Sequence, residues 1–183
     1  MIIMITRARV SGCFGSSLVA GAVLVSSAIG SAVLAGAAFG LLGAALEPAS
    51  RALLAGAAAA VIVVGAILRP VPWQLDRETD TAWLTYQDWR TAAYNGFALG
   101  LGFTTRIGFW LFYLVPLTAF VVADPLLAAL GYAAFALSRV GMSALLAALD
   151  VWIPGGIERA RFIADPLAVI ALGALFAVVV PWP

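Results

Sequence analysis

Apolar residues form five long stretches of the chain, and short polar segments separate them. Four of these stretches have the length of one membrane-crossing helix, which needs about 20 mostly apolar residues. The four are Ala52–Leu68, Gly96–Ala123, Leu126–Leu149, and Leu167–Val180 with its flanking residues. The pattern predicts an all-α fold, a polytopic integral membrane helical bundle that forms a single transmembrane domain over residues 1–183.

The first apolar stretch, Val10–Leu46, is too long for one simple crossing. At 1.5 Å per residue its helix would extend about 55 Å, whereas the hydrocarbon core of a bilayer is about 30 Å thick. Two crossings would leave no room for a polar loop, so we predict five transmembrane helices, with six as the alternative. In the five-span arrangement the excess length is taken up by tilt, by protrusion, or by a break at one of the glycines.

Arginine positions separate the two topologies, because loops rich in arginine usually face the cytoplasm. In the five-span arrangement with a cytoplasmic N-terminus, Arg51 is the only arginine in the segments outside the cell. Seven arginines then lie inside, namely Arg7, Arg9, Arg69, Arg77, Arg90, Arg159 and Arg161. Six spans divide the loop arginines three against five. The predicted location is therefore the plasma (inner) membrane, with the N-terminus in the cytoplasm and the C-terminus outside.

Acidic residues followed by proline mark three predicted helix starts. These are Glu47-Pro48, Asp124-Pro125 and Asp165-Pro166. An acidic side chain at the N-cap accepts hydrogen bonds from free backbone N–H groups, and proline fits the first helical position. The first two pairs lie 77 residues apart, which indicates a two-unit repeat over 10–95 and 96–164, followed by a terminal helix over 165–183. A chance match in sequence rich in alanine, glycine and leucine is the alternative.

The longest polar segment, residues 69–95, is predicted to lie on the cytoplasmic surface of the membrane. We expect one amphipathic juxtamembrane helix from Thr81 to Tyr94, ended by Asn95-Gly96. Aromatic side chains such as Trp89 suit the headgroup level, where a ring keeps one edge in water. A docking surface for a soluble partner is the alternative.

Composition narrows the classes of function. Hydrophobic residues make up 64% of the chain and charged residues 10%, whereas a soluble domain is nearer half apolar and a quarter charged. The natural solvent is therefore the lipid bilayer. A net charge of +1 gives no strong field to attract nucleic acid, so we expect no nucleic-acid partner. Histidine is absent, and with it the usual general base and the commonest metal ligand. We expect no enzymatic activity, no cofactor and no metal.

Two arginines fall inside predicted spans and are the main candidates for a binding site. Arg106 and Arg139 lie at the same predicted depth on antiparallel neighbours, about 15 Å from the cytoplasmic edge. Each costs roughly 2.5–3.5 kcal/mol to insert, and no acidic residue lies in the same spans. Such a pair can bind a small anion, unless both side chains instead reach the inner headgroups. The remaining candidates for this anion or substrate site are Trp110, Tyr113, Tyr132 and Ser143.

Glycine spacing predicts two places where helices approach closely. Gly36–Gly40 and Gly96–Gly100 both match the G-x-x-x-G pattern, which removes side chains from one helix face. These glycines are expected to supply packing rather than chemistry.

Two short motifs resemble those of a known family. Ser11-Gly12-Cys13-Phe14-Gly15 opens the first stretch, and Thr104-Thr105-Arg106-Ile107-Gly108 lies in the third. They resemble the Pro-Cys motifs of the membrane thiol–disulfide electron carriers of the CcdA and DsbD type. Cys13 would match the first cysteine of that family, whereas Arg106 would replace the second and both prolines are missing. The resemblance implies a degenerate thiol-redox membrane carrier, although one cysteine cannot perform two-thiol chemistry.

These observations favour a transporter-like or anion-handling membrane protein. A different class has support from the small size of the chain and its 18 glycines. That class is a non-catalytic accessory or assembly subunit of a larger membrane complex. The expected partners are the lipid bilayer, a small anion, and either another membrane protein or further copies of this chain as a homo-oligomer.

Overall fold

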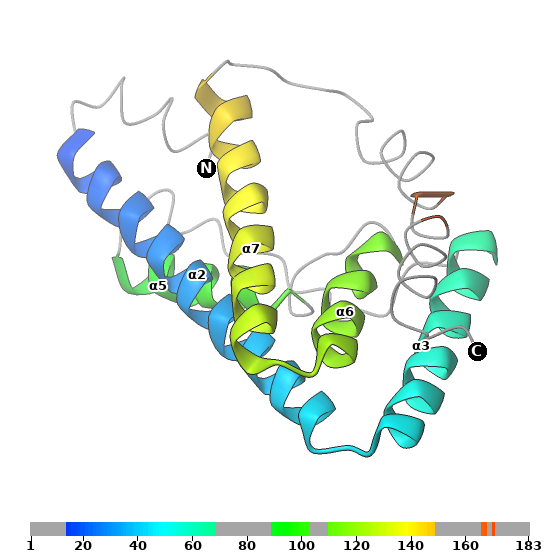
Figure 1. Cartoon of the computed structure of the whole chain (residues 1–183). Helices are drawn as coiled ribbons and strands as arrows, with labels where there is room; N and C mark the ends of the chain where they lie inside the picture. The colour runs from blue at the N-terminus through cyan, green and yellow to red at the C-terminus, as the bar shows by residue number, and fades with distance from the viewer. Residues whose placement is uncertain (1–13, 69–88, 103–109, 149–165, 168–169, 171–183) are drawn as a thin grey trace. The chain divides into compact units, whose positions relative to one another are not determined.

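The computed structural model describes residues 14–68, 89–102, 110–148, 166–167 and 170, and every element within them is helical (Figure 1). The all-α class is therefore confirmed for the described part of the chain. The elements are α2 (Phe14–Ala44), α3 (Pro48–Leu68), α5 (Trp89–Leu101), the 3-10 helix η1 (Trp110–Tyr113), α6 (Leu114–Val122) and α7 (Pro125–Ala148).

The second and fourth apolar stretches form helices close to the predicted boundaries, and both helices begin at a proline. At the start of α7, Asp124 Oδ1 accepts hydrogen bonds from the backbone N–H groups of Leu126 at 2.8 Å and Leu127 at 3.0 Å. The predicted N-cap is confirmed there. At the start of α3 the carbonyl oxygen of Glu47 accepts the first helical hydrogen bond, from the Arg51 N–H at 2.9 Å. Asp165 lies outside the described residues.

Helix α2 is unbroken over its 31 residues, which gives it a length of about 46 Å. A glycine-induced break between Phe14 and Ala44 is therefore wrong. Gly36 and Gly40 lie on the buried side of the helix, where the absence of a side chain serves packing against a neighbour. Such packing holds a glycine in helical conformation despite its backbone freedom.

The third apolar stretch does not form one continuous helix. Helix α5 ends at Leu101, and Gly102 follows with a φ of 84°, a left-handed conformation that glycine adopts without steric cost. Helical structure is described again from Trp110, as η1 and α6. Pro116 lies in the first turn of α6, where the missing N–H of proline costs no helical hydrogen bond. The prediction of one helix over Gly96–Ala123 is wrong.

The expected helix end at Asn95-Gly96 is also wrong, because α5 continues through both residues. Gly96 instead lies against α2, where a Cβ would meet the carbonyl oxygen of Leu24. The sequence pattern that resembles a C-terminal cap is here a packing contact. Residues 69–88, which hold most of the predicted juxtamembrane helix, lie outside the described residues.

Two of the described helices are long and apolar enough to cross a membrane, Val19–Ala44 within α2 and Pro48–Leu68. Only 28% of the most apolar part of each is buried, whereas the core helix of a soluble protein is mostly buried. Large aliphatic side chains point outward instead, among them Leu34, Leu53 and Ile67. An exposed apolar surface of this kind marks contact with a membrane or another protein. The two helices favour membrane association.

The chain divides into two compact units that interleave along the sequence. Unit 1 comprises Met1–Ala35, Leu75–Arg106 and Tyr132–Pro154, and unit 2 comprises Gly36–Gln74, Ile107–Gly131 and Gly155–Pro183. Helices α2 and α7 contribute to both. The repeat over 10–95 and 96–164 remains a prediction.

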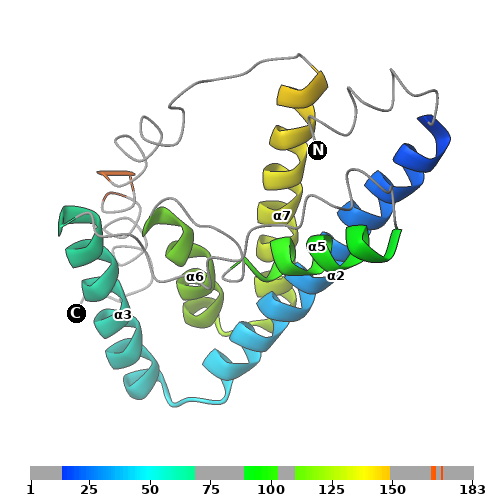
Figure 2. The ribbon, with the colours of Figure 1, turned by 180° about the vertical axis from the view of Figure 1, so that it is seen from behind.

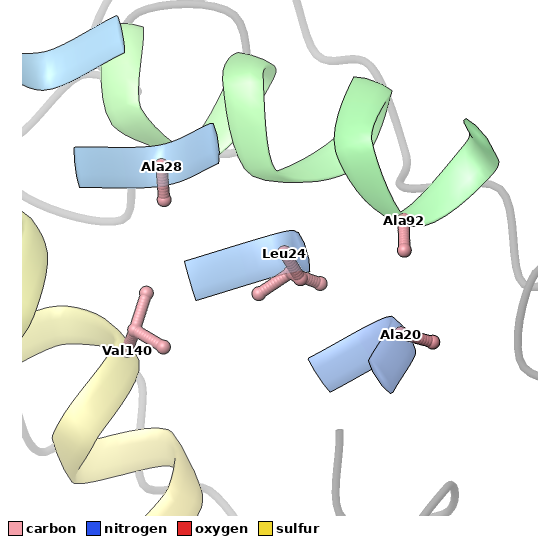
Figure 3. Packing of buried hydrophobic residues seen from close by; sticks show 5 residues of the cluster. All are labelled: Ala20, Leu24, Ala28, Ala92 and Val140. Carbon is pink, nitrogen blue, oxygen red and sulfur yellow. The ribbon is translucent and has the colours of Figure 1, made fainter. Parts of the chain in front are cut away.

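Unit 1 has a core of small and aliphatic side chains from three helices. Figure 3 shows Ala20, Leu24 and Ala28 from α2 together with Ala92 from α5 and Val140 from α7. Helix α5 lies against the first half of α2, and both ribbon views show this (Figures 1 and 2). The two helices approach so closely that a Cβ at Gly100 would meet the carbonyl oxygen of Ala28. The predicted packing of Gly96–Gly100 is confirmed.

Unit 2 contains the second close approach, between the last part of α2 and the start of α7 with the residue before it, Asp124. A Cβ built on Gly36 would lie 2.5 Å from the Ala128 carbonyl oxygen, and one on Gly40 would lie 2.8 Å from the Asp124 carbonyl oxygen. The predicted packing of Gly36–Gly40 is confirmed. The core of this unit is aliphatic and joins α3 to α6. Its buried members are Ala55, Ala59, Ile62, Leu114 and Leu117.

Candidate functional site

Two polar side chains are buried within the part of the chain that the structure describes, and both belong to unit 1. Ser31 on α2 and Asn95 on α5 are each 2% exposed. Ser31 Oγ donates a hydrogen bond to the Ala28 carbonyl oxygen of its own helix at 3.1 Å. Asn95 Nδ2 has no hydrogen-bond partner among the described residues. An amide donor buried without a partner costs about 1–3 kcal/mol, so Asn95 is the most unusual polar group of the unit.

Sequence reasoning did not select Asn95, because Asn95-Gly96 matches a helix end. The available signal was its position at the border of a long apolar stretch. A polar side chain on a helix that continues into apolar sequence has to find a partner inside the protein.

Arg139 joins α7 to the end of α5. The side chain is half-buried, and Nη1 donates a hydrogen bond to the Leu99 carbonyl oxygen at 3.3 Å. Leu99 is among the last four residues of α5, whose carbonyl groups have no partner within the helix. A guanidinium at this end also faces the negative pole of the helix dipole. The charge of Arg139 is therefore stabilised by a helix terminus.

In unit 2, Arg51 likewise donates a hydrogen bond to a carbonyl group at the C-terminus of a helix. Its Nη1 donates a hydrogen bond to the Gly43 carbonyl oxygen at 3.2 Å, and Gly43 is the residue before the last of α2. An arginine in the first turn of α3 thus caps the C-terminus of the preceding helix. The signal was present in the sequence, since Arg51 lies only eight residues after Gly43.

The predicted site residues fall into two groups. Tyr132 is buried on α7, seven residues before Arg139 and so on the same face of that helix, and both belong to unit 1. Trp110 and Tyr113 belong to unit 2, where their rings lie 5.5 Å apart with an interplanar angle of 39°. Arg106 and the side chain of Ser143 lie outside the described residues. The pairing of Arg106 with Arg139 therefore stays a prediction.

Trp110 and Tyr113 line an apolar pocket of about 510 Å³ in unit 2. Its walls come from the end of α2, from α3, and from η1 and α6. The indole of Trp110 lies against Gly65 of α3, where a Cβ would be 2.5 Å from Cδ2 of the ring. Gly65 was not among the predicted site residues, although it provides the space for one of them.

No group of three histidine, cysteine, aspartate or glutamate side chains that could hold a metal ion occurs among the described residues. Cys13, which carries the resemblance to thiol–disulfide carriers, lies outside them. Comparisons with known proteins found no family model, no curated protein and no solved structure that matches the chain. Its function has to follow from the chemistry of its own residues.

Proposed function

We propose that this chain is a five-span protein of the plasma (inner) membrane that binds and transports a small polar or anionic solute. The N-terminus lies in the cytoplasm and the C-terminus outside. The unbroken course of α2 supports a single crossing by the first apolar stretch. Arg51 is the only arginine that this topology places outside, and its hydrogen bond to Gly43 gives it a structural reason to be there.

The burial of Asn95 is the observation that carries the proposal. Polar side chains inside a membrane bundle are costly and usually belong to a pathway or binding site. The Nδ2 group requires an acceptor, and a carboxylate, an inorganic oxyanion or a halide supplies one. Arg139 and Tyr132 belong to the same unit, and the positive charge of Arg139 favours an anion over a cation.

The interruption of the third apolar stretch gives further support. Many transporters bind solutes where a membrane helix is discontinuous, because the ends of the half-helices present polar backbone groups. Helix α5 ends at Leu101 in the middle of apolar sequence, and Asn95 lies fewer than two turns before this end. The polar residue and the helix end therefore lie on the same short helix.

The test is anion flux into vesicles that contain the purified protein. Swelling of the vesicles in chloride, nitrate and acetate salts is followed by light scattering, for the wild type, Asn95→Leu and Ser26→Ala. Ser26 is the control, because its exposed hydroxyl bonds only to the Val23 carbonyl of its own helix. We expect Asn95→Leu to abolish flux and Ser26→Ala to preserve it.

Two results would contradict the proposal. Equal flux in all three proteins would show that Asn95 has no part in transport. Absence of flux in the wild type for all three anions would favour the accessory-subunit function instead, and a defined heteromeric complex after purification in mild detergent would support that reading.

A further inference from the structure

The apolar pocket of unit 2 is a second site with a chemistry of its own. At about 510 Å³ it falls within the range of roughly 300–1,000 Å³ that is typical of small-molecule sites. Its lining residues are all aliphatic or aromatic. A charged or strongly polar occupant would lose its hydration there without gaining hydrogen bonds. The apolar lining therefore favours a hydrocarbon chain as the ligand of this pocket.

The mouth of the pocket opens on the outer apolar surface. Leu42 on α2 and Leu54 and Val61 on α3 line the pocket, and yet they are 54%, 50% and 60% exposed. These side chains belong to the same faces of α2 and α3 that present large aliphatic residues to the surroundings. An occupant reaches the pocket from the medium around those faces. In a membrane, that medium is the acyl chains of the lipids.

Aromatic rings form part of the pocket wall. Trp110 is held against the backbone of α3 at Gly65, and the ring of Tyr113 lies 5.5 Å from it. The close contact of Trp110 with α3 restricts the movement of this ring. A pre-formed site binds a flexible chain at a smaller entropic cost than a site that must be assembled.

We propose that this pocket holds one acyl chain of a membrane lipid, which enters past Leu42, Leu54 and Val61 and ends against Trp110. The lipid is a specifically bound ligand, distinct from the lipids that exchange rapidly around the protein. This inference rests on the proposed membrane location and is independent of transport through unit 1.

The experiment measures quenching of Trp110 fluorescence by a phospholipid that is brominated on its acyl chains. The protein retains Trp110 as its only tryptophan and is reconstituted in membranes in which the brominated lipid is the main phospholipid, so that a bound acyl chain is usually brominated. Ala58→Phe fills the pocket, because Ala58 is one of its lining residues. Ala57→Phe is the matched control, since Ala57 is the exposed neighbour on α3 and is not part of the lining.

We expect strong quenching in the single-tryptophan protein and in its Ala57→Phe variant, and loss of most of it in its Ala58→Phe variant. Val61→Phe narrows the mouth at an exposed position and provides the same comparison if Ala58→Phe does not fold. Equal quenching in the single-tryptophan protein and in the folded pocket variants would mean that surrounding lipid reaches Trp110 without a bound chain, and it would overturn the inference. An unquenched single-tryptophan protein in the membrane fraction would overturn it too. Absence of the protein from the membrane fraction would instead refute the membrane location.

Discussion

Gly40 provides a quantitative test of the contact between α2 and the start of α7. A Cβ at this position would lie 2.8 Å from the Asp124 carbonyl oxygen, 2.8 Å from Pro125 Cα and 3.0 Å from Ala128 Cβ. Optimal separations between carbon atoms are about 3.5–4.0 Å. Two of these atoms belong to the backbone, so the added methyl group of Gly40→Ala cannot be accommodated by a side-chain rotation.

Gly30 provides the matched control in the same helix. It is exposed, and a Cβ built there has no heavy atom within 4 Å. Both substitutions gain the greater helix propensity of alanine, which is about 1 kcal/mol. Only Gly40→Ala also meets the cost of overpacking, which is typically about 1–3 kcal/mol. The difference between the two variants isolates the steric effect, since the propensity gain cancels.

Unfolding of the detergent-solubilised protein, followed by circular dichroism as denaturing detergent is added, measures this difference. We expect Gly30→Ala to be as stable as the wild type or more so. Gly40→Ala should be less stable than Gly30→Ala by about 1–3 kcal/mol. If Gly40→Ala unfolds at the same point as Gly30→Ala, α2 does not approach the start of α7 as closely as described, and the reasoning about glycine packing fails.

Three further predictions address the capping groups and the topology. Asp124→Ala removes the side-chain acceptor at the start of α7 and should lower the free energy of unfolding by about 0.5–2 kcal/mol, and an unchanged denaturation midpoint would contradict this. Arg139→Lys should keep more of the stability than Arg139→Leu in the same assay, because an ammonium still donates to the Leu99 carbonyl, and equal losses would argue against capping. Reporter fusions at Pro183 and within residues 76–88 should report opposite sides of the membrane, and five spans are excluded if both report the same side.

The helix starts of α3 and α7 could be predicted because the determining chemistry is local. Asp124 accepts hydrogen bonds from residues two and three positions ahead, and the proline that follows sets its own φ. The capping hydrogen bonds and the fixed φ of proline both depend only on residues within a few positions of the boundary. The sequence therefore contains all the information that the two boundaries require.

The break in the third stretch could not be read from apolar pattern, because hydropathy is the same in a continuous and in an interrupted helix. The break falls at Gly102, which has a left-handed φ of 84°, but this chain has 18 glycines and most of those described are inside helices, so a glycine alone does not predict it. Gly96 shows the opposite difficulty. A glycine that follows asparagine is typical of a helix end, and only the position of Leu24 on a distant part of the chain reveals that it serves packing.

Arg139 shows why a charged residue in an apolar stretch has more than one explanation. From sequence, its insertion cost of roughly 2.5–3.5 kcal/mol requires a compensating partner, and an anion was the partner that the sequence suggested. The structure supplies another, the Leu99 carbonyl at the end of α5, and a hydrogen bond to a charged group contributes about 1.5–3 kcal/mol. At 3.3 Å the contact is long for a charge-assisted hydrogen bond, so the helix end offsets part of the cost of Arg139. No such compensation exists for the amide of Asn95 among the described residues, and the case for a bound solute therefore rests more on Asn95 than on the arginine.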